Sequence, residues 1–153
     1  IAKERCNVLL KVSFYKLNTI EENKLDFAVI ACRYNKKWIY VKHKKRNTWE
    51  IPGGHKEANE NIDDAAKREL YEETGAQKFH LYPICIYSVD RENAKSYGQL
   101  YYGDVYSFDS MPDYEIEKMR LFDSMPSNLT YPLIQPSLFE KAKEYLNKIH
   151  STC

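Results

Sequence analysis

The sequence lacks the features that would place the chain in a membrane, in a disulfide scaffold or on a nucleic-acid surface. It has no long uninterrupted apolar run and no basic N-terminal region followed by an apolar one, so we expect neither a membrane span nor a signal peptide. Its four cysteines are dispersed and form no C-x-x-C pair, which predicts free thiols and a cytoplasmic location. A formal net charge of +1 argues against a surface that coats nucleic acid.

Glycine is also scarce, yet two of the five glycines, Gly53 and Gly54, are adjacent and follow the apolar residues Ile51 and Pro52. Adjacent glycines permit unusual backbone angles and a close approach of the backbone to a ligand, so we predict a loop here. The chain length and the ordinary share of hydrophobic (43%) and charged (29%) residues predict a single domain over residues 1–153.

A helix is predicted directly after the glycine loop, from Ile62 to Thr74. Asn61 is a suitable N-cap, because its side chain can accept a hydrogen bond from a free backbone N–H group of the first turn. Gly75 suits the left-handed position that ends many helices.

One face of this helix has the spacing of an apolar stripe but ends in carboxylates. Ile62, Ala66, Glu69 and Glu73 follow one another at steps of four, three and four, and Glu72 lies beside them. Carboxylates about 4 Å apart near a protein surface repel by about 4 kcal/mol, and the C-terminal turn of a helix disfavours negative charge. Oxygen ligands without a partnering Cys or His suit Mg²⁺ or Mn²⁺, so we predict such an ion here. The alternative is an ordinary solvated acidic helix face.

The spacing of the charged and glycine positions resembles the signature of the Nudix hydrolases. The matching positions are Gly54, Glu60, Arg68-Glu69-Leu70, Glu72-Glu73 and Gly75. Two uncharged positions depart from the family pattern: Ala76 stands where a larger aliphatic residue is usual, and Asn59 where many members have glycine.

The resemblance implies an α/β fold, a Nudix-like α/β/α sandwich with a mixed β-sheet packed between helices. It implies hydrolysis of a nucleoside diphosphate linked to another group, with one carboxylate taking the proton of the attacking water. It further implies that Arg68 orients Glu69 through charge-assisted hydrogen bonds, and that Glu60 supports the loop or the metal site. The metal ligands that it implies are Glu69, Glu72, Glu73 and the carbonyl oxygen of Gly53.

Outside the signature, β-branched and aromatic runs predict strands, and turn residues separate them. The predicted strands are Asn7 to Leu17, Phe27 to Arg33, Lys37 to Lys42, Tyr82 to Val89 and Leu100 to Phe108. The second and third strands flank a predicted hairpin turn at Tyr34-Asn35-Lys36, and the last two form another hairpin. Glu115 to Phe122 fits either a strand or a helical turn, whereas Pro136 to His150 has the spacing of a helix.

A catalytic acidic residue outside the signature is expected from the resemblance. The candidates are Asp104, Glu115, Glu117 and Asp123. We choose Glu115, because in many Nudix proteins an acidic residue opens a similar run, although it also fits a solvated loop.

The basic run ahead of the glycine loop supplies candidate substrate-binding residues. We expect Lys45 and Arg46 to contact substrate phosphates, with a solvated loop as the alternative. We assign no catalytic role to His43, His55 or His80, because none has a metal-ligand partner at a suitable spacing.

Tyrosine is abundant, with thirteen residues, and several tyrosines fall in predicted strands. Tyr87, Tyr101, Tyr102 and Tyr106 suit core packing better than stacking on a nucleobase, since strand aromatics usually fill a core or half-buried face.

The substrate class is inferred from the same resemblance. The chain has no proline between Ile84 and Met111, which argues against ADP-ribose hydrolases. The segments from Trp49 to Gly54 and from Leu121 to Pro126 resemble MutT-type nucleoside triphosphate pyrophosphatases, including those that clear 8-oxo-dGTP. We therefore predict a small nucleotide substrate, no polymeric nucleic acid or membrane partner, and a monomer or homodimer. The alternatives are a dinucleoside polyphosphate or nucleotide-sugar hydrolase and a non-catalytic nucleotide-sensing module.

Overall fold

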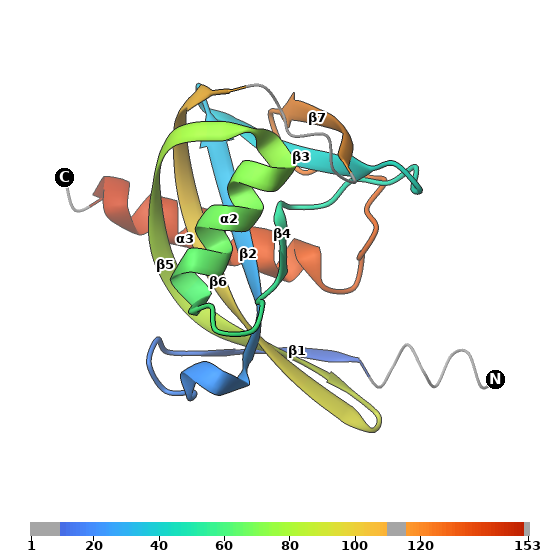
Figure 1. The fold of residues 1–153 in the computed structure, drawn as a ribbon, viewed down its shortest axis with the longest axis vertical. Helices are drawn as coiled ribbons and strands as arrows, with labels where there is room; N and C mark the ends of the chain where they lie inside the picture. The colour runs from blue at the N-terminus through green and yellow to red at the C-terminus, as the bar shows by residue number, and fades with distance from the viewer. Residues whose placement is uncertain (1–9, 110–115, 152–153) are drawn as a thin grey trace.

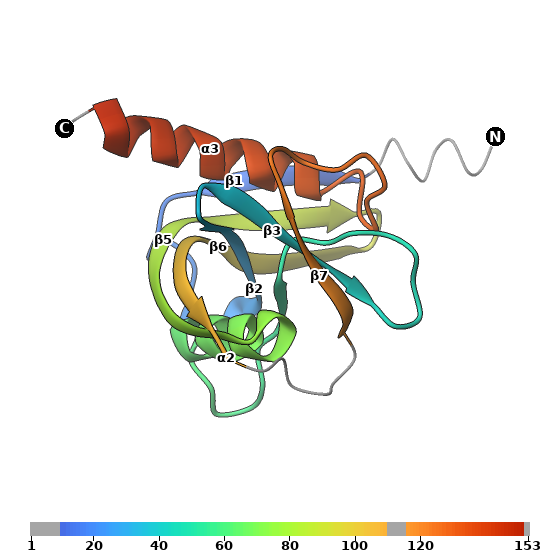
Figure 2. The ribbon, with the colours of Figure 1, turned by 90° about the horizontal axis from the view of Figure 1, so that it is seen from above.

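The computed structural model describes residues 10–109 and 116–151, which form a mixed sheet with one long helix on each side (Figures 1 and 2). This arrangement confirms the predicted α/β/α sandwich. The elements in chain order are β1 (Lys11–Tyr15), the short 3₁₀ helix η1 (Glu22–Lys24), β2 (Leu25–Tyr34), β3 (Lys37–His43), β4 (Gly53–His55), α2 (Ile62–Thr74), β5 (Ala76–Arg91), β6 (Ala94–Phe108), β7 (Ile116–Phe122) and α3 (Gln135–Ser151).

The strands follow the order β1-β5-β6-β2-β3-β7, and β4 pairs with β2 beside this path. β2 and β6 are parallel, whereas the other pairs are antiparallel. β2 has two partners on the same side: Arg33 and Tyr34 pair with β3, and Phe27 to Val29 pair with the glycine strand β4. The sheet therefore opens between β3 and β4, next to the C-terminal end of α2 (Figure 1).

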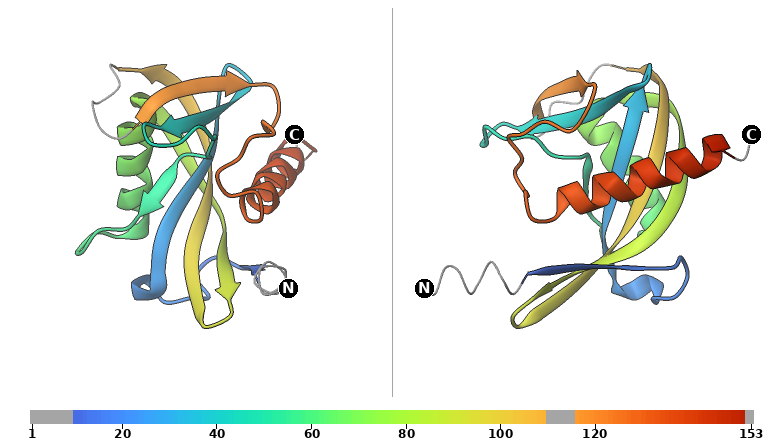
Figure 3. Two further views of the ribbon diagram at one scale, coloured as in Figure 1. Left: turned by 90° about the vertical axis from the view of Figure 1, so that its right-hand side faces the viewer. Right: turned by 180° about the vertical axis from the view of Figure 1, so that it is seen from behind.

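The two faces of the sheet carry separate cores, one under each helix (Figure 3). Under α2, Ala65, Ala66 and Leu70 pack against β2 residues such as Ile30. Under α3, Leu138, Phe139, Ala142 and Leu146 pack against Trp38, Tyr40, Tyr87 and Tyr102. Tyr87, Tyr101 and Tyr102 are buried, which confirms core packing for them, whereas Tyr106 is exposed.

The predicted β2–β3 hairpin is present, but its turn has two residues, Asn35 (φ 55°) and Lys36 (φ 67°), because Tyr34 belongs to β2. The segment that fitted either a strand or a helical turn is the strand β7, which pairs with β3. β5 and β6 are longer than predicted, and β4 was not predicted. In the described ranges, neither α2 nor α3 nor any shorter helix has the length and apolar content needed to cross a membrane.

Candidate active site

The helix α2 carries the site, and its ends are those that the sequence predicts. The Asn61 side chain accepts a hydrogen bond from the Asp64 N–H group at 2.8 Å. Gly75 is left-handed (φ 76°), and its N–H group donates to the carbonyl oxygen of Tyr71. The caps therefore fix which residues lie in the last two turns, and these turns carry Glu69, Glu72 and Glu73.

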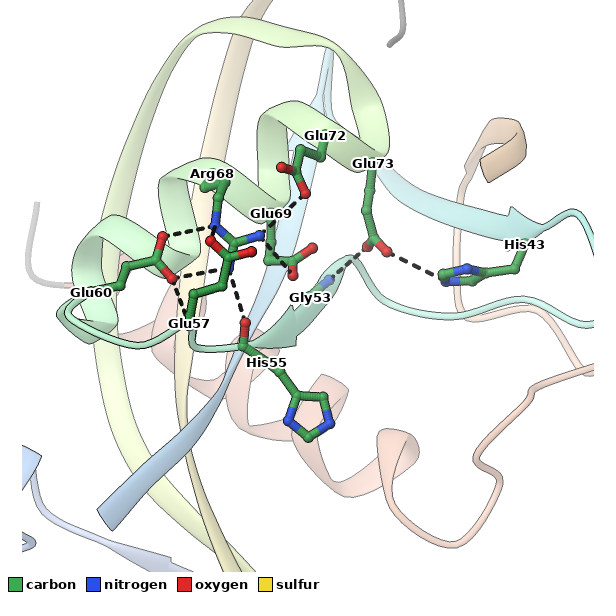
Figure 4. A network of polar contacts seen from close by, with 9 residues as sticks. All are labelled: His43, Gly53, His55, Glu57, Glu60, Arg68, Glu69, Glu72 and Glu73. Carbon is green, nitrogen blue, oxygen red and sulfur yellow. Dashed lines mark hydrogen bonds and ion pairs between the residues drawn. The ribbon is translucent and has the colours of Figure 1, made fainter. Parts of the chain in front are cut away.

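Arg68 lies at the centre of the acidic cluster (Figure 4). Its Nε donates to Glu60 Oε2 at 2.7 Å and its Nη2 to Glu60 Oε1 at 3.0 Å, which is a bidentate pair. Nη2 also donates to the carbonyl oxygen of His55 at 2.9 Å. Nη1 donates to Glu69 at 3.3 Å and to Glu72 at 3.2 Å. Arg68 thus contacts Glu69 as expected, but its shortest contact is with Glu60.

Glu60 has the loop-supporting position expected of it. Its Oε1 also accepts a hydrogen bond from the Glu57 N–H group at 2.9 Å, so one carboxylate joins the loop before α2 to Arg68. These hydrogen bonds, the one from Arg68 above all, lower the pKa of Glu60 and keep it charged.

Glu73 faces the other side of the site and is held separately from Arg68. Its Oε1 accepts a hydrogen bond from the Gly53 N–H group at 2.9 Å, and its Oε2 lies 3.4 Å from His43 Nε2. The same His43 nitrogen lies 3.4 Å from Glu50 Oε1. Glu50 and Glu73 are both buried, although both are acidic.

Burial and mutual repulsion shift the protonation of these groups. Burial, followed by the charge of Glu73, raises the pKa of Glu69 to about 7. Burial also raises the pKa of Glu73, against the opposing effect of its hydrogen bonds from His43 and Gly53. The hydrogen bond to Glu50, followed by that to Glu73, raises the pKa of His43 to about 10. Burial is therefore the main reason why the charged forms of Glu69 and Glu73 are disfavoured.

Both glycines lie too close to their neighbours for a side chain to fit unless something moves. A Cβ atom at Gly54 would collide with the carboxylate of Glu69, and one at Gly53 would collide with the backbone carbonyl of Ala28. The glycine strand therefore allows the carboxylates of α2 to lie directly against the backbone of β4.

A cavity of about 780 Å³ joins the acidic cluster to an apolar slot. The acidic end is lined by Glu69, Glu72, Glu73, Arg68 and the glycine strand. The slot lies toward the first turn of α3 and is lined by Phe27, Val29, Ile51, Tyr87, Val89, Leu138, Ser96 and Gln135. Gln135 is 6% exposed, and its Oε1 accepts a hydrogen bond from the Ile51 N–H group at 2.9 Å.

The side chains that the sequence proposes as metal ligands offer the oxygen donors that a hard divalent cation prefers. Every candidate side-chain ligand is a carboxylate, and burial, followed by the charge of Glu73, raises the pKa of Glu69; a bound cation would oppose both effects. In residues 10–109 and 116–151, however, no three His, Cys, Asp or Glu side chains converge closely enough to share one ion. Glu69 and Glu72 are turned toward Arg68, whereas Glu73 is turned toward Gly53 and His43.

The other predicted site residues, Lys45, Arg46 and Glu115, are not among the described residues that line the cavity. Arg46 donates to the hydroxyl group of Tyr131, which lines the cavity, and pairs with Glu50 at 3.6 Å. Lys45 is exposed. Glu115 lies outside the described residues, so its role stays a prediction.

Two other candidates for the distal acidic residue have partners of their own. Asp104 accepts a hydrogen bond from Tyr102, and Asp123 pairs with Lys37 at 3.6 Å. The side chain of Glu117 lies outside the described part of the chain.

Among the cavity residues that the sequence does not identify, His43, Glu50 and Gln135 hold other parts of the site in place. The sequence assigns no role to His43, because its partner Glu73 lies 30 positions away and no local spacing relates the two. A charged residue between Trp49 and Ile51, inside an apolar run, was the one available signal for Glu50.

The chain is similar in sequence to known proteins. The NUDIX domain family matches residues 23–97. The chain is 33% identical to YtkD of Bacillus subtilis (strain 168), which is provisionally named an 8-oxo-dGTP diphosphatase. The 102 aligned residues make up 66% of this chain and 64% of YtkD. Over 44 residues it is 52% identical to an 8-oxo-dGTP diphosphatase of Buchnera aphidicola, which covers 27% of this chain and 35% of that protein. The chain thus spans less than two thirds of these curated relatives.

The fold is similar to that of solved structures. A mutant of the Bacillus subtilis pyrophosphohydrolase BsRppH superposes with a TM-score of 0.72 and 26% sequence identity, over 89% of this chain and 90% of that chain.

Proposed function

Because the chain belongs to the NUDIX domain family, we propose that it is a Mg²⁺-dependent pyrophosphohydrolase that converts a nucleoside triphosphate and water to a nucleoside monophosphate and pyrophosphate. The observation that carries this proposal is that one cavity joins the carboxylates of α2 to an apolar slot. An anionic phosphate chain with its metal ion fits the first part, and a flat nucleobase fits the second.

The metal ion would be held by Glu69, Glu72 and Glu73 together with the carbonyl oxygen of Gly53. When bound, a divalent cation neutralises phosphoryl oxygens and lowers the pKa of an attacking water. The protein's own contribution is to orient the carboxylates and accept a proton. Arg68 remains charged at all relevant pH values, so it can orient Glu69 and Glu72 without exchanging protons with them.

The slot favours an oxopurine. Because the Ile51 N–H group occupies the oxygen of Gln135, this amide offers its NH₂ group to a ligand. An NH₂ group can donate to the O6 acceptor of a guanine, whereas adenine presents an NH₂ donor at the same edge. The names of the two sequence relatives also mention 8-oxo-dGTP. We therefore propose guanine-type triphosphates, oxidised ones included, as the preferred substrates.

A substrate panel with Mg²⁺ or a chelator tests the proposal, with products identified by chromatography. The panel holds 8-oxo-dGTP, the common nucleoside triphosphates, ADP-ribose, a nucleotide sugar and a diadenosine polyphosphate. We expect Mg²⁺-dependent monophosphate and pyrophosphate, with the highest kcat/KM for a guanine-type triphosphate. If only the diadenosine polyphosphate or the nucleotide sugar is hydrolysed, the substrate class proposed here is wrong. If nucleotides bind but none is hydrolysed, the protein is a sensing module.

Glutamine substitutions test which residues carry the reaction. Glu72→Gln and Glu73→Gln should abolish turnover while the fold is retained. Glu144→Gln is the matched control, because Glu144 lies on α3 with an exposed side chain and pairs only loosely with Lys141 at 3.9 Å. Full activity of both site variants would refute the assignment. A cytoplasmic location and a monomeric or homodimeric state remain predictions from the sequence.

A further inference from the structure

The second oxygen of Glu73 depends on His43. Gly53 satisfies Oε1 through its backbone N–H group at 2.9 Å, and His43 Nε2 faces Oε2 at 3.4 Å (Figure 4). His43 comes from the end of β3 and Glu73 from the last turn of α2, so this contact joins two elements across the opening in the sheet. His43 also lines the cavity.

Glu73 needs such a partner more than the other carboxylates do. It is 7% exposed, and it occupies the C-terminal turn, where the helix dipole disfavours negative charge. In α2, all of whose residues are described, the last turn carries no basic residue. Arg68, which pairs with Glu69 and Glu72, is directed away from Glu73 (Figure 4).

His43 is itself held in place by Glu50. The Glu50 carboxylate lies 3.4 Å from His43 Nε2, and the Glu50 backbone is fixed by two 2.9 Å hydrogen bonds with Val41 of β3. The far oxygen of Glu50 faces Arg46 at 3.6 Å. The imidazole therefore lies between two buried carboxylates, one of which is anchored to a rigid strand.

We propose that His43 is a positioning residue for the cation site: held by Glu50, it keeps the carboxylate of Glu73 beside Gly53, at the edge of the cavity where the divalent ion would bind. This inference rests on the metal-dependent function proposed above. A purely structural His–Glu pair would stabilise the fold but would leave the affinity for the ion unchanged, and this difference can be measured.

The test measures Mn²⁺ affinity by electron paramagnetic resonance, without substrate or turnover. His43→Leu removes the donor, whereas His43→Gln keeps an N–H donor at about the same reach. We expect Mn²⁺ to bind about 10- to 100-fold more weakly to His43→Leu, as is usual when a residue that orients a metal ligand is lost. His43→Gln should recover most of this affinity. His80→Leu, at an exposed histidine that stacks on Tyr82, should bind Mn²⁺ as the wild type does.

The outcomes separate this inference from the proposed function. Unchanged or tighter Mn²⁺ binding by a folded His43→Leu protein, in an enzyme that still turns over triphosphate, would overturn the role of His43 and leave the proposed function intact. Equal losses in His43→Gln and His43→Leu would overturn it as well. A wild-type protein that neither binds Mn²⁺ nor hydrolyses any nucleotide would overturn both.

Discussion

Arg68 and Glu60 form the pair whose contribution the structure defines best, and a double-mutant cycle should measure it. Two parallel hydrogen bonds of 2.7 and 3.0 Å join them. Their side chains are only 22% and 15% exposed. The cycle compares the wild type with Arg68→Ala, Glu60→Ala and the double variant. Contacts that each residue makes elsewhere cancel in the coupling energy.

The expected coupling follows from geometry and exposure. Hydrogen bonds to charged groups contribute about 1.5–3 kcal/mol, whereas exposed ion pairs contribute at most about 1 kcal/mol. For a bidentate pair that is mostly but not fully shielded, we expect about 2 kcal/mol. The chain offers a matched control in Glu57, which faces the same Arg68 Nε at 3.6 Å with a side chain that is 67% exposed. The double-mutant cycle of Glu57 with Arg68 should give a coupling energy below about 0.5 kcal/mol.

Urea denaturation of both sets of variants measures the free energies of unfolding. A chelator must be present, so that no divalent ion replaces the charge of Arg68. The free energy of unfolding should fall with urea concentration at the same slope in every variant. A changed slope would mean that the variant alters the unfolded state or the cooperativity of unfolding. Equal coupling in the two cycles would refute the reasoning, since it would show that bidentate geometry and shielding do not set the strength of the pair.

Three further predictions concern the glycine strand, the core and the thiols. Gly54→Ala should lower kcat/KM about tenfold or more, because its Cβ would displace the Glu69 carboxylate; a variant with wild-type kcat/KM would contradict this. Leu70→Ala, at a fully buried position under α2, should lower the free energy of unfolding by about 2–5 kcal/mol, and a loss below about 1 kcal/mol in urea titrations would contradict the packing. Burial raises the pKa of the Cys32 thiol and shields it, so iodoacetamide should label Cys32 only in urea. Peptide mass spectrometry measures the labelling, and a labelled Cys32 in the folded protein would disprove its burial.

The bounds of α2 could be predicted because local residues set them. The hydrogen bond from Asp64 to Asn61 and the left-handed Gly75 act within one turn of the helix ends. The same holds for the hairpin at Asn35 and Lys36, where two positive φ angles close a two-residue turn. In each case the residues that decide the structure are close in sequence.

Strand lengths could not be predicted, because pairing partners far along the chain decide them. β5 begins at Ala76, directly after the helix, and this end pairs with Phe108 at the far end of β6. No alternation in the polar stretch after Gly75 indicates a strand, yet the neighbouring strand supplies its hydrogen bonds. β4 is a strand for the same reason, although two of its three residues are glycines.

Within the site, the signature residues of α2 could be identified from spacing, whereas the residues that support them could not. Arg68 and Glu69 are neighbours on one helix, so a pattern can relate them. His43 reaches Glu73 from another element, and Gln135 comes from a helix that begins 60 positions after Gly75. Such contacts depend on how β3 and α3 pack, and this packing has no fixed spacing in the sequence.

The segment from Trp49 to Gly53 shows in physical terms why the site has no simple pattern. Each of its residues bonds to a different part of the molecule. The Trp49 backbone bonds to the loop at residues 128–130, the Glu50 backbone to β3, Ile51 to the side chain of Gln135, and Pro52 to β2. The Gly53 N–H group then bonds to α2 through Glu73.

A segment with so many partners cannot alternate as a strand or repeat as a helix, but it fixes one geometry at the point where all of these elements meet. Each partner places a residue of the cavity: Val41 anchors the Glu50 that holds His43, and Ile51 orients the amide of Gln135. The acidic end and the apolar slot are therefore positioned by the same short segment. A change in its backbone should therefore disturb the proposed metal binding and the proposed base selection together, even though no residue of α2 is altered.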